Sequence, residues 1–462
     1  MLTLIVPAAV IAQVAPAPAP APGGALDISV VQGVVDLQRG TDGTEVAAVA
    51  HAPLLAGDIL STGQDSYAEI HMGRGVRLRL DGNSQIRVAN IDASGSEVQL
   101  GQGTVELRLF RASSAQVDTP QIGILANSPG SYAIAMNPDG TSTVTAFAGS
   151  ATVLEQSGAQ QTLVQGQSLQ ASGTADAPSL EPTAAIALSP QFVAFNGQLD
   201  QAAARQFANA SAAAPIDGAE DLVGYGRWID TPYGWAWVPN EPPSWTPYSA
   251  GQWAWEPYYG YVWVGYEPWG WAPYHYGRWF FRPGIGWAWA PGPPAPWAPG
   301  FVVFVRTGPT IAWLPLAPRD PFVPWWGVHA SFGFGTNIAV YHNVYVAHAF
   351  VATPLAAFSA GNFTGVRAVA YANLGHPVFV DNIARAIPPT RANLAFGART
   401  VVHPIVHPAV FASRSFAGHP VTAQRSFARP YPQFAHPNSR PHPNNRERPR
   451  EHPQEHSGSH HE

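Results

Sequence analysis

The sequence contains no cysteine and no lysine, and each absence excludes a class of chemistry. Without cysteine the chain forms no disulfide, no catalytic thiol and no cysteine-ligated zinc site. Without lysine it lacks the phosphate-binding lysine of P-loop enzymes and kinases and the amine of Schiff-base enzymes. Charge is also sparse, since 12% of the 462 residues are charged and the net charge is −6. No positive field therefore favours nucleic acid as a partner.

Apolar runs long enough to span a bilayer are missing as well. Residues 2–12 are mostly apolar and residues 10–12 include small side chains, but a membrane helix needs about 20 apolar residues. An alanine-proline run at 15–22 follows, which is typical of an extended spacer. We therefore expect residues 1–24 to be an export signal and spacer, and the protein to be periplasmic or secreted, with no membrane span.

Residues 26–172 show the period of β-strands. Val76, Leu78 and Leu80 alternate with Arg77 and Arg79, and similar alternation recurs further along the chain. This pattern places the aliphatic set in a core and the arginines in water. Turn-forming residues separate the runs at short intervals. The segment is therefore predicted to be all-β, forming a sandwich, a barrel or a short β-solenoid.

Short motifs within this segment resemble the FecR family of periplasmic domains. They lie at residues 31–35, 55–63, 118–120, 130–134 and 149–153, in the order that the family has. One departure is Gly130-Ser131, where the family usually has Gly-Thr. The resemblance implies an envelope domain with a role in signal transduction. Because no helical anti-sigma segment precedes the domain, we expect no direct relay to a sigma factor by this chain alone.

A connecting helix is predicted within the linker at 173–214. Ser189 is a typical N-cap and Pro190 a typical first helical residue. One apolar stripe follows: Phe192, Phe195, Leu199, Ala203 and Phe207. Such a stripe indicates a helix that docks on a neighbouring element.

All sixteen tryptophans lie between Trp228 and Trp326, and they recur every 25 or 26 residues. Each repeat has a Gly-x-Trp strand, a Pro/Gly turn and a returning strand of the form Gly-aromatic-x-Trp. The pattern predicts antiparallel hairpins, stacked through their aromatic faces into one domain over 215–330. The aromatics expected to hold the repeats together are Trp228, Trp235, Trp237, Trp253, Trp263, Trp287, Trp289, Trp297 and Trp313.

This block resembles a second family, a Trp/Gly-rich domain of unknown function (DUF6600) found after FecR-like domains in exported proteins. The motifs that carry the resemblance lie at 218–222, 225–228, 233–239, 268–279, 287–292 and 313–320. The resemblance implies a domain identity and no activity.

The strongest of these motifs, residues 268–279, supplies the candidate ligand contacts. They are Trp269, Trp271, Tyr274, His275, Tyr276, Arg278 and Trp279. Two interpretations stay open for the aromatics, which either form the core or present a platform for sugar rings or quaternary ammonium groups. His275 either contacts a ligand or is a hydrogen-bonded residue packed among aromatic rings. Arg278 either stacks on a ring or binds an anion.

No catalytic motif is present, so we predict a non-enzymatic protein without a cofactor. Glu256 and Glu267 flank the strands of the second repeat. Two carboxylates at an aromatic cleft are the minimum for glycoside hydrolysis, which keeps a carbohydrate-active enzyme as the alternative. The other interpretation of these residues is a solvated rim of charge around an apolar sheet.

Periodicity fades after the repeats. Residues 331–384 are predicted to hold a few short strands, and residues 385–462, rich in His, Pro and Arg, to be disordered. His-Pro pairs in this tail could chelate metal weakly, but no specific metal site is expected. The sequence therefore predicts an all-β envelope protein that binds another envelope protein or a glycan such as peptidoglycan, with a FecR-type signalling accessory or a purely structural role as further alternatives. It does not indicate the oligomeric state.

Overall fold

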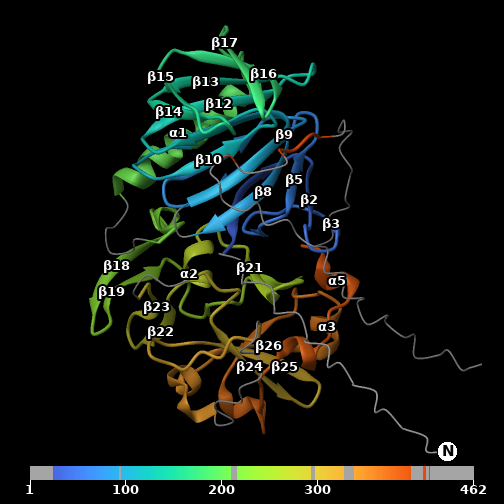
Figure 1. The fold of residues 1–462 in the computed structure, drawn as a ribbon. Coiled ribbons are helices and arrows are strands. Elements are labelled where there is room, and N and C mark those ends of the chain that lie inside the picture. The colour runs from blue at the N-terminus through green and yellow to red at the C-terminus, as the bar shows by residue number, and fades with distance from the viewer. Residues whose placement is uncertain are drawn as a thin grey trace, which may run out of the picture. The chain divides into compact units, whose positions relative to one another are not determined.

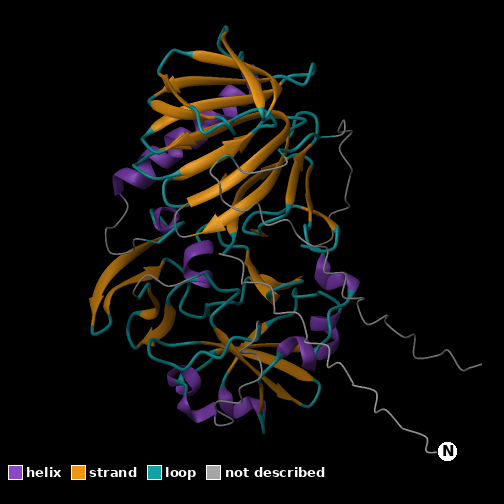
Figure 2. Ribbon diagram, in the orientation of Figure 1, coloured by secondary structure: helices purple, strands orange, loops and turns teal. Residues whose placement is uncertain are grey.

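The computed structural model describes residues 24–92, 95–209, 216–292, 297–326, 338–396, 409–412 and 416. These residues all belong to one compact unit of the chain, residues 1–425. The predictions for the export signal and for most of the tail lie outside the described residues. Strands dominate what is described, and helix α1 is the longest helix, as Figure 2 shows.

Residues 26–182 form a β sandwich, in agreement with the prediction of an all-β first half (Figure 1). Its strands pair in two series that share strand β9. The first series runs β1 (Leu26–Gln32), β6 (Tyr67–His71), β7 (Val76–Leu80), β9 (Gly95–Leu109), β12 (Gly130–Met136), β13 (Ser142–Ala148), β16 (Ser168–Thr174) and β17 (Ala177–Pro182).

The second series starts at the other edge of the sandwich. It runs β3 (Glu45–Ala47), β2 (Val35–Gln38), β5 (Ile59–Thr62), β8 (Gln85–Asp92), β9, β10 (Ala115–Asp118), β11 (Gly123–Ala126), β14 (Ser150–Leu154) and β15 (Gln160–Val164), while β4 (Pro53–Leu54) pairs with β1. The β9–β10 pair is parallel and the others are antiparallel. Aliphatic side chains from both series, Leu78 and Val117 among them, share one buried core.

The outer face of the first series is charged and nevertheless buried. Arg77 is 2% exposed and Arg79 is 0% exposed, so the prediction that these arginines point into water is wrong. Two later elements cover them, helix α1 (Pro190–Asn209) and the short 3-10 helix η1 (Ala219–Leu222), and both supply acidic partners. Alternation identified the two faces correctly, but it does not reveal that a charged face is covered by a distant segment.

Helix α1 is the connecting helix that the sequence predicts. Ser189 caps it, its Oγ accepting a hydrogen bond from the backbone N–H of Phe192 at 3.2 Å. Phe192 and Phe195 stack on Tyr67 of β6, with ring centroids 6.1 and 5.2 Å from the tyrosine ring. The apolar stripe therefore docks on the sandwich, and the polar residues beside it reach the buried arginines.

The tryptophan repeats form four hairpins within what we call the tryptophan domain, residues 216–396. The hairpins are β18 (Gly226–Thr231) with β19 (Gly234–Pro239), β20 (Gly251–Glu256) with β21 (Gly260–Gly265), β22 (Arg278–Arg282) with β23 (Gly286–Ala290), and β24 (Val302–Thr307) with β25 (Thr310–Pro315). The first three place two tryptophans opposite each other: Trp228 and Trp237, Trp253 and Trp263, and Trp279 and Trp289.

The glycine of the Gly-x-Trp motif leaves space for the indole of the opposing strand. A Cβ at Gly251 would lie 2.4 Å from the ring of Trp263, and one at Gly226 would lie 2.5 Å from the ring of Trp237. Real side chains do not approach so closely. The repeat therefore needs glycine where the indole of the returning strand crosses the first strand.

In a regular repeat the hairpins would stack in sequence order, but these four do not. The first and third join into one sheet through the pairing of Trp237 with Trp289, while the second hairpin stands as a two-stranded sheet. The fourth gains three strands from later in the chain: β26 (Phe350–Pro354), β27 (Arg367–Val369) and β28 (Val378–Val380). The segment predicted to hold a few short strands thus completes a five-stranded sheet.

Short helices fill the rest of the tryptophan domain. They are α2 (Trp271–His275), η2 (Ile338–Val340), η3 (His342–Tyr345), α3 (Leu355–Ser359), η4 (Tyr371–Leu374), α4 (Ile383–Ala386) and α5 (Arg391–Leu394). Disorder was predicted from residue 385 onward, and it is wrong for residues 385–396, where Phe396 reaches the sandwich core. Among the later residues, Val410 donates a backbone hydrogen bond to Gly101, and Phe411 lies under the guanidinium of Arg87.

Candidate functional site

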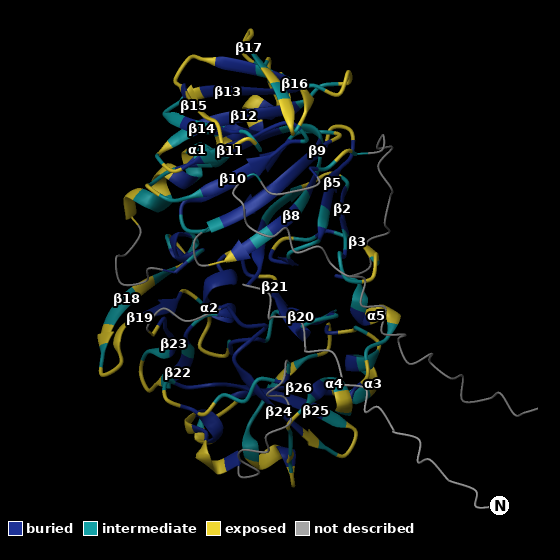
Figure 3. Cartoon of the chain, viewed as in Figure 1, coloured by how far each residue is buried: buried dark blue, intermediate teal, exposed yellow. Residues whose placement is uncertain are grey.

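The indoles mainly form the core of the tryptophan domain. Trp235 is the one tryptophan that is exposed, at 54%, while Trp228, Trp245, Trp255 and Trp326 are half-buried and the others are buried. Figure 3 shows that α2, in the middle of this domain, is buried. The tryptophan rings meet edge to face, as Trp253 and Trp263 do at 5.3 Å between centroids. Edge-to-face contact is favourable because the positive ring edge meets the negative ring face.

The candidate ligand contacts of residues 268–279 are brought together, but mostly in the interior. Trp269, Trp271, Tyr274, His275 and Trp279 are at most 2% exposed, and Tyr276 and Arg278 are half-buried. The indole N–H of Trp279 donates to the backbone oxygen of Pro273 at 3.0 Å. In this structure the five buried side chains contact other protein groups rather than solvent.

His275 lies among aromatic rings at the end of α2. Its Nδ1 is 2.7 Å from the backbone oxygen of Ala298, and its ring lies 5.0 Å from that of Trp297 and 4.6 Å from that of Trp271. Burial lowers the pKa of His275 to about 4. The neutral imidazole therefore donates from Nδ1 to Ala298 and packs as an aromatic ring.

Arg278 stacks on rings. Its guanidinium carbon lies 3.9 Å from the centroid of Phe301 and 5.3 Å from that of Phe322. Burial lowers its pKa from the ordinary value. This geometry corresponds to the stacking interpretation, in which the cation lies over an aromatic face.

The two glutamates proposed for the enzymatic alternative each have separate buried partners. Glu256 contacts Arg39 of the sandwich, and burial raises the pKa of Glu256 to about 8 although Arg39 acts to lower it. Glu267 accepts hydrogen bonds from the Tyr274 hydroxyl at 2.8 Å and from the Trp245 indole at 3.3 Å. Burial raises the pKa of Glu267 to about 7. Because both carboxyl groups are buried, they do not form the solvated rim of charge that was the other interpretation.

A groove with a free volume of about 310 Å³ lies between the loop after β19 and the β22–β23 hairpin. Its walls include Pro239, Glu241, Pro242, Trp245, Phe281 and Trp287. Phe281 and Trp287 face each other across the hairpin with ring centroids 5.8 Å apart. The sequence analysis did not identify this groove, although the Pro242-Pro243 pair before Trp245 marks an irregular wall beside an aromatic residue.

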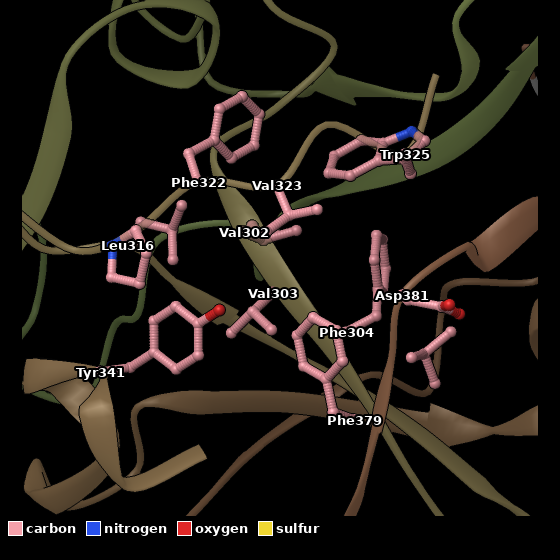
Figure 4. A pocket seen from close by; sticks show the side chains of 12 residues that line it. Val302, Val303, Phe304, Leu316, Phe322, Val323, Trp325, Tyr341, Phe379 and Asp381 are labelled. Atoms are coloured by element: carbon pink, nitrogen blue, oxygen red, sulfur yellow. The ribbon is translucent and has the colours of Figure 1, made fainter. Parts of the chain in front are cut away.

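A second hollow lies beside β24, where Phe304, Trp325 and Phe379 converge (Figure 4). Its volume is about 10 Å³, which is the space of about one water molecule. The groove at Trp245 is therefore the better candidate for binding a ligand.

A cluster of charged groups is buried where the sandwich meets η1. Arg77 pairs with Glu220 at 2.6 Å, and Arg79 pairs with Glu69 and with Asp200, both at 2.8 Å. The sequence analysis missed this cluster because its members are far apart in the chain.

Histidines and aspartates complete the cluster beside these arginine pairs. His51 Nδ1 lies 3.2 Å from Asp27 Oδ1, and His71 lies 3.6 Å from Asp27 and 3.7 Å from Asp221. Burial and Arg77 act to lower the pKa of His71, but the nearby carboxylates outweigh them and raise it to about 9.

Comparisons with known families find one match in each of the two β domains. Residues 58–152 match the model of the FecR protein family, and residues 219–320 match a family of unknown function, DUF6600. The chain therefore matches the FecR family model first and the DUF6600 family model after it. The first match lies within the β sandwich and the second covers all four hairpins, as the sequence motifs imply.

Solved structures add little to this assignment. Two crystal structures of a protein from Parabacteroides distasonis ATCC 8503, provisionally assigned as an anti-sigma factor, are 15% and 14% identical to the chain, with a TM-score of 0.23 in each case. Each match covers 28% of this chain and 60% of the other, so this chain spans less than two thirds of that protein. No curated protein matches the chain.

Among the described residues of the chain, no helix combines the length and the apolar character needed to cross a bilayer.

Proposed function

We propose that this FecR–DUF6600 chain is an exported, non-enzymatic protein of the cell envelope that binds a glycan in the groove of its DUF6600 domain. The FecR match supports a place in the envelope, since the resemblance is to periplasmic domains. The observation that carries the binding proposal is the groove, which places half-buried aromatic side chains beside one carboxylate.

The chemistry of the groove suits a sugar ring. Phe281 and Trp245 are half-buried, so part of each ring is free to cover the C–H face of a pyranose. Glu241, also half-buried, supplies an acceptor for hydroxyl or amide N–H groups. The volume of about 310 Å³ suits one or two sugar units of a longer chain.

The aromatic wall is held in place before any ligand arrives. Trp245 donates to Glu267 and contacts Trp269 and Trp279 edge to face, with ring centroids 5.7 and 5.4 Å away. A rigid wall loses little conformational entropy on binding, which favours affinity.

Calorimetric titration of the full chain with soluble peptidoglycan fragments tests the proposal. We expect Phe281→Ala and Glu241→Gln each to lower affinity about tenfold, since each removes a contact of about 1.5 kcal/mol. Tyr345→Ala is the matched control, because Tyr345 is 77% exposed and lies on η3 rather than in the groove. The proposal is wrong if all three variants bind the fragments as tightly as the wild type, or if the wild type does not bind them.

The FecR match supports a second candidate function, a signalling accessory that binds an envelope protein through its sandwich. Two apolar side chains on adjacent parts of that domain are exposed, Phe147 at 38% and Val164 at 45%. Replacing both with Ser would weaken capture of an envelope protein while leaving glycan titrations unchanged. Loss of glycan binding in that double variant would count against this second role.

A further inference from the structure

The buried charged cluster contains three side chains whose free atoms converge. Asp27 belongs to β1, His71 to β6 and Asp221 to η1, and one potential ligand atom from each lies within 4.8 Å of the other two. His71 Nδ1 is 3.6 Å from Asp27 Oδ2 and 3.7 Å from Asp221 Oδ2. These separations exceed a hydrogen bond, so the three atoms face one another without bonding directly.

Two of these atoms are deeply buried and have no hydrogen-bond partner among the described residues. They are Asp27 Oδ2 and His71 Nδ1, in side chains that are 0% and 3% exposed. A buried polar atom without a partner costs about 1 to 3 kcal/mol, so a ligand that bonded both atoms would remove this cost. Arg77 does not satisfy them, because its guanidinium donates to Glu220 and to the backbone oxygen of Val76.

The spacing of the three atoms fits a tetrahedral metal ion. Zinc binds histidine nitrogen and carboxylate oxygen at about 2.0 to 2.2 Å, which places neighbouring ligand atoms about 3.4 Å apart. The two separations at His71 Nδ1 come within a few tenths of an ångström of that value. A histidine with two carboxylates is a donor set that zinc and similar divalent ions accept.

The two carboxylates are also oriented through their other oxygen, while His71 Nε2 lies at an ion-pair separation of 3.7 Å from Glu69. Asp27 Oδ1 lies 3.2 Å from His51 Nδ1. Asp221 Oδ1 accepts a hydrogen bond from Gln206 Nε2 at 3.2 Å. Metal-binding histidines and carboxylates are commonly held in this way, with one atom on the metal and the other fixed by a neighbouring group.

The balance of charge points in the same direction. Six carboxyl groups gather around His71 and the two arginines Arg77 and Arg79. They belong to Asp27, Glu69, Asp200, Asp217, Glu220 and Asp221. The two guanidinium charges and a protonated His71 together balance three of these six groups, and a divalent ion in place of the His71 proton would offset more of the negative charge.

We propose that Asp27, His71 and Asp221 bind a divalent transition-metal ion of the zinc class. The ion would connect strands β1 and β6 of the FecR-containing sandwich to η1, where the DUF6600 match begins. Its role would be to fasten the two domains, and it is independent of the glycan groove. The sequence analysis predicted no metal site because the three ligands are widely separated in the chain.

Titration of the metal-stripped full chain with Zn²⁺, in competition with a chelating dye, tests the site. We expect one tight equivalent in the wild type, above any weaker binding by the histidines after residue 400. His71→Ala and Asp221→Asn should lose that equivalent. The matched controls His376→Ala and Asp176→Asn should keep it, since both residues are exposed and lie outside the cluster.

A milder variant keeps the test valid if the ligand variants do not fold. Gln206→Ala removes only the group that orients Asp221, so we expect about a tenfold loss of Zn²⁺ affinity in a folded protein. Co²⁺ in the wild type should give the strong visible absorption of a tetrahedral site. No tight equivalent in the wild type, or an unchanged one in both ligand variants, would overturn the proposal.

Discussion

The sandwich and the tryptophan domain bury their side chains in different ways. The sandwich core is built from Val, Leu, Ile and Ala that alternate along strands of varied length. The tryptophan domain uses indoles, and those of Trp237 and Trp263 each lie against a glycine on the facing strand. A core of alternating aliphatic side chains can form on strands of irregular length, whereas a large flat ring packs only where a matching space exists. This difference explains why the second half has a strict sequence period and the first does not.

Their buried polar groups differ in the same way. In the sandwich, charged side chains are buried in pairs, as Arg79 is with Glu69. In the tryptophan domain, indole N–H groups donate to backbone oxygens, as Trp289 does to Tyr276 at 2.8 Å and Trp313 to Tyr248 at 3.0 Å. The sandwich therefore depends on charges from other segments, whereas the indoles of Trp289 and Trp313 find their acceptors within their own domain.

The largest effect is expected at Arg39, where the two domains meet. Arg39 bonds Asp58 at 2.6 Å and contacts Glu256, and all three side chains are buried. Arg39→Met would leave two buried carboxyl groups without their cation and cost about 4 kcal/mol. All tryptophans lie in the second domain, so their fluorescence reports whether a change in the sandwich destabilises its neighbour.

We expect the urea midpoint measured by tryptophan fluorescence to fall in Arg39→Met. Ala254 and Val264 of the second hairpin pack in the sandwich core, which couples the two domains. The control is Arg39→Met with Glu256→Gln, which removes one of the two uncompensated acids and should recover part of the loss. An unchanged fluorescence midpoint would show that the two domains unfold independently.

The next largest effect tests the glycine–indole pairing. Gly251→Ala brings a methyl group within 2.4 Å of the Trp263 ring and 2.5 Å of the backbone oxygen of Val264. Because neither a buried ring nor a paired strand can move away cheaply, we expect a loss of about 3 kcal/mol in urea unfolding. Gly365→Ala, with nothing within 4 Å of the added methyl, should change stability little. Equal losses in the two variants would contradict the pairing argument.

The same contrast shows what the sequence could predict. The repeat of Trp228, Trp253 and Trp279 predicted hairpins, because a strict period identifies a copied unit. It did not predict that the first and third hairpins would pair, since strand-edge pairing depends on long-range packing. Alternation around Leu78 predicted the strand, but not the burial of Arg77, whose partner Glu220 comes from the next domain. The candidate sites were missed for the same reason, because their residues converge only after folding.

A smaller effect is expected from pH, within the tryptophan domain. Burial raises the pKa of Glu267 to about 7, from an ordinary value of 4.5 in the unfolded chain. The folded protein therefore holds this proton more tightly. The resulting stability is fully present below about pH 4.5 and is lost as pH rises through 7, by roughly 3 kcal/mol.

Glu267→Gln isolates that contribution. Its amide oxygen can still accept from Tyr274 and Trp245, but it does not titrate. Urea unfolding at pH 5 and pH 8 should show the wild type losing more stability than the variant between the two values. A parallel change in both proteins would mean that Glu267 is already ionised in the fold at pH 5.

The smallest effect is expected at Trp235, the exception to the buried indoles. Trp235 is 54% exposed and Trp237, on the same strand, is fully buried beneath Trp269 at 4.9 Å. Trp235→Ala should therefore change the free energy of unfolding by less than about 0.5 kcal/mol and remove a red-shifted component of the fluorescence. Trp237→Ala should destabilise the domain strongly, because it leaves a cavity among other rings. Alternation places both side chains on one face of β19, so their difference arises along the strand, whose first two residues are exposed and whose last four are buried. A large loss in Trp235→Ala would show that the outer ring is also covered, and that the domain has no free indole on this strand.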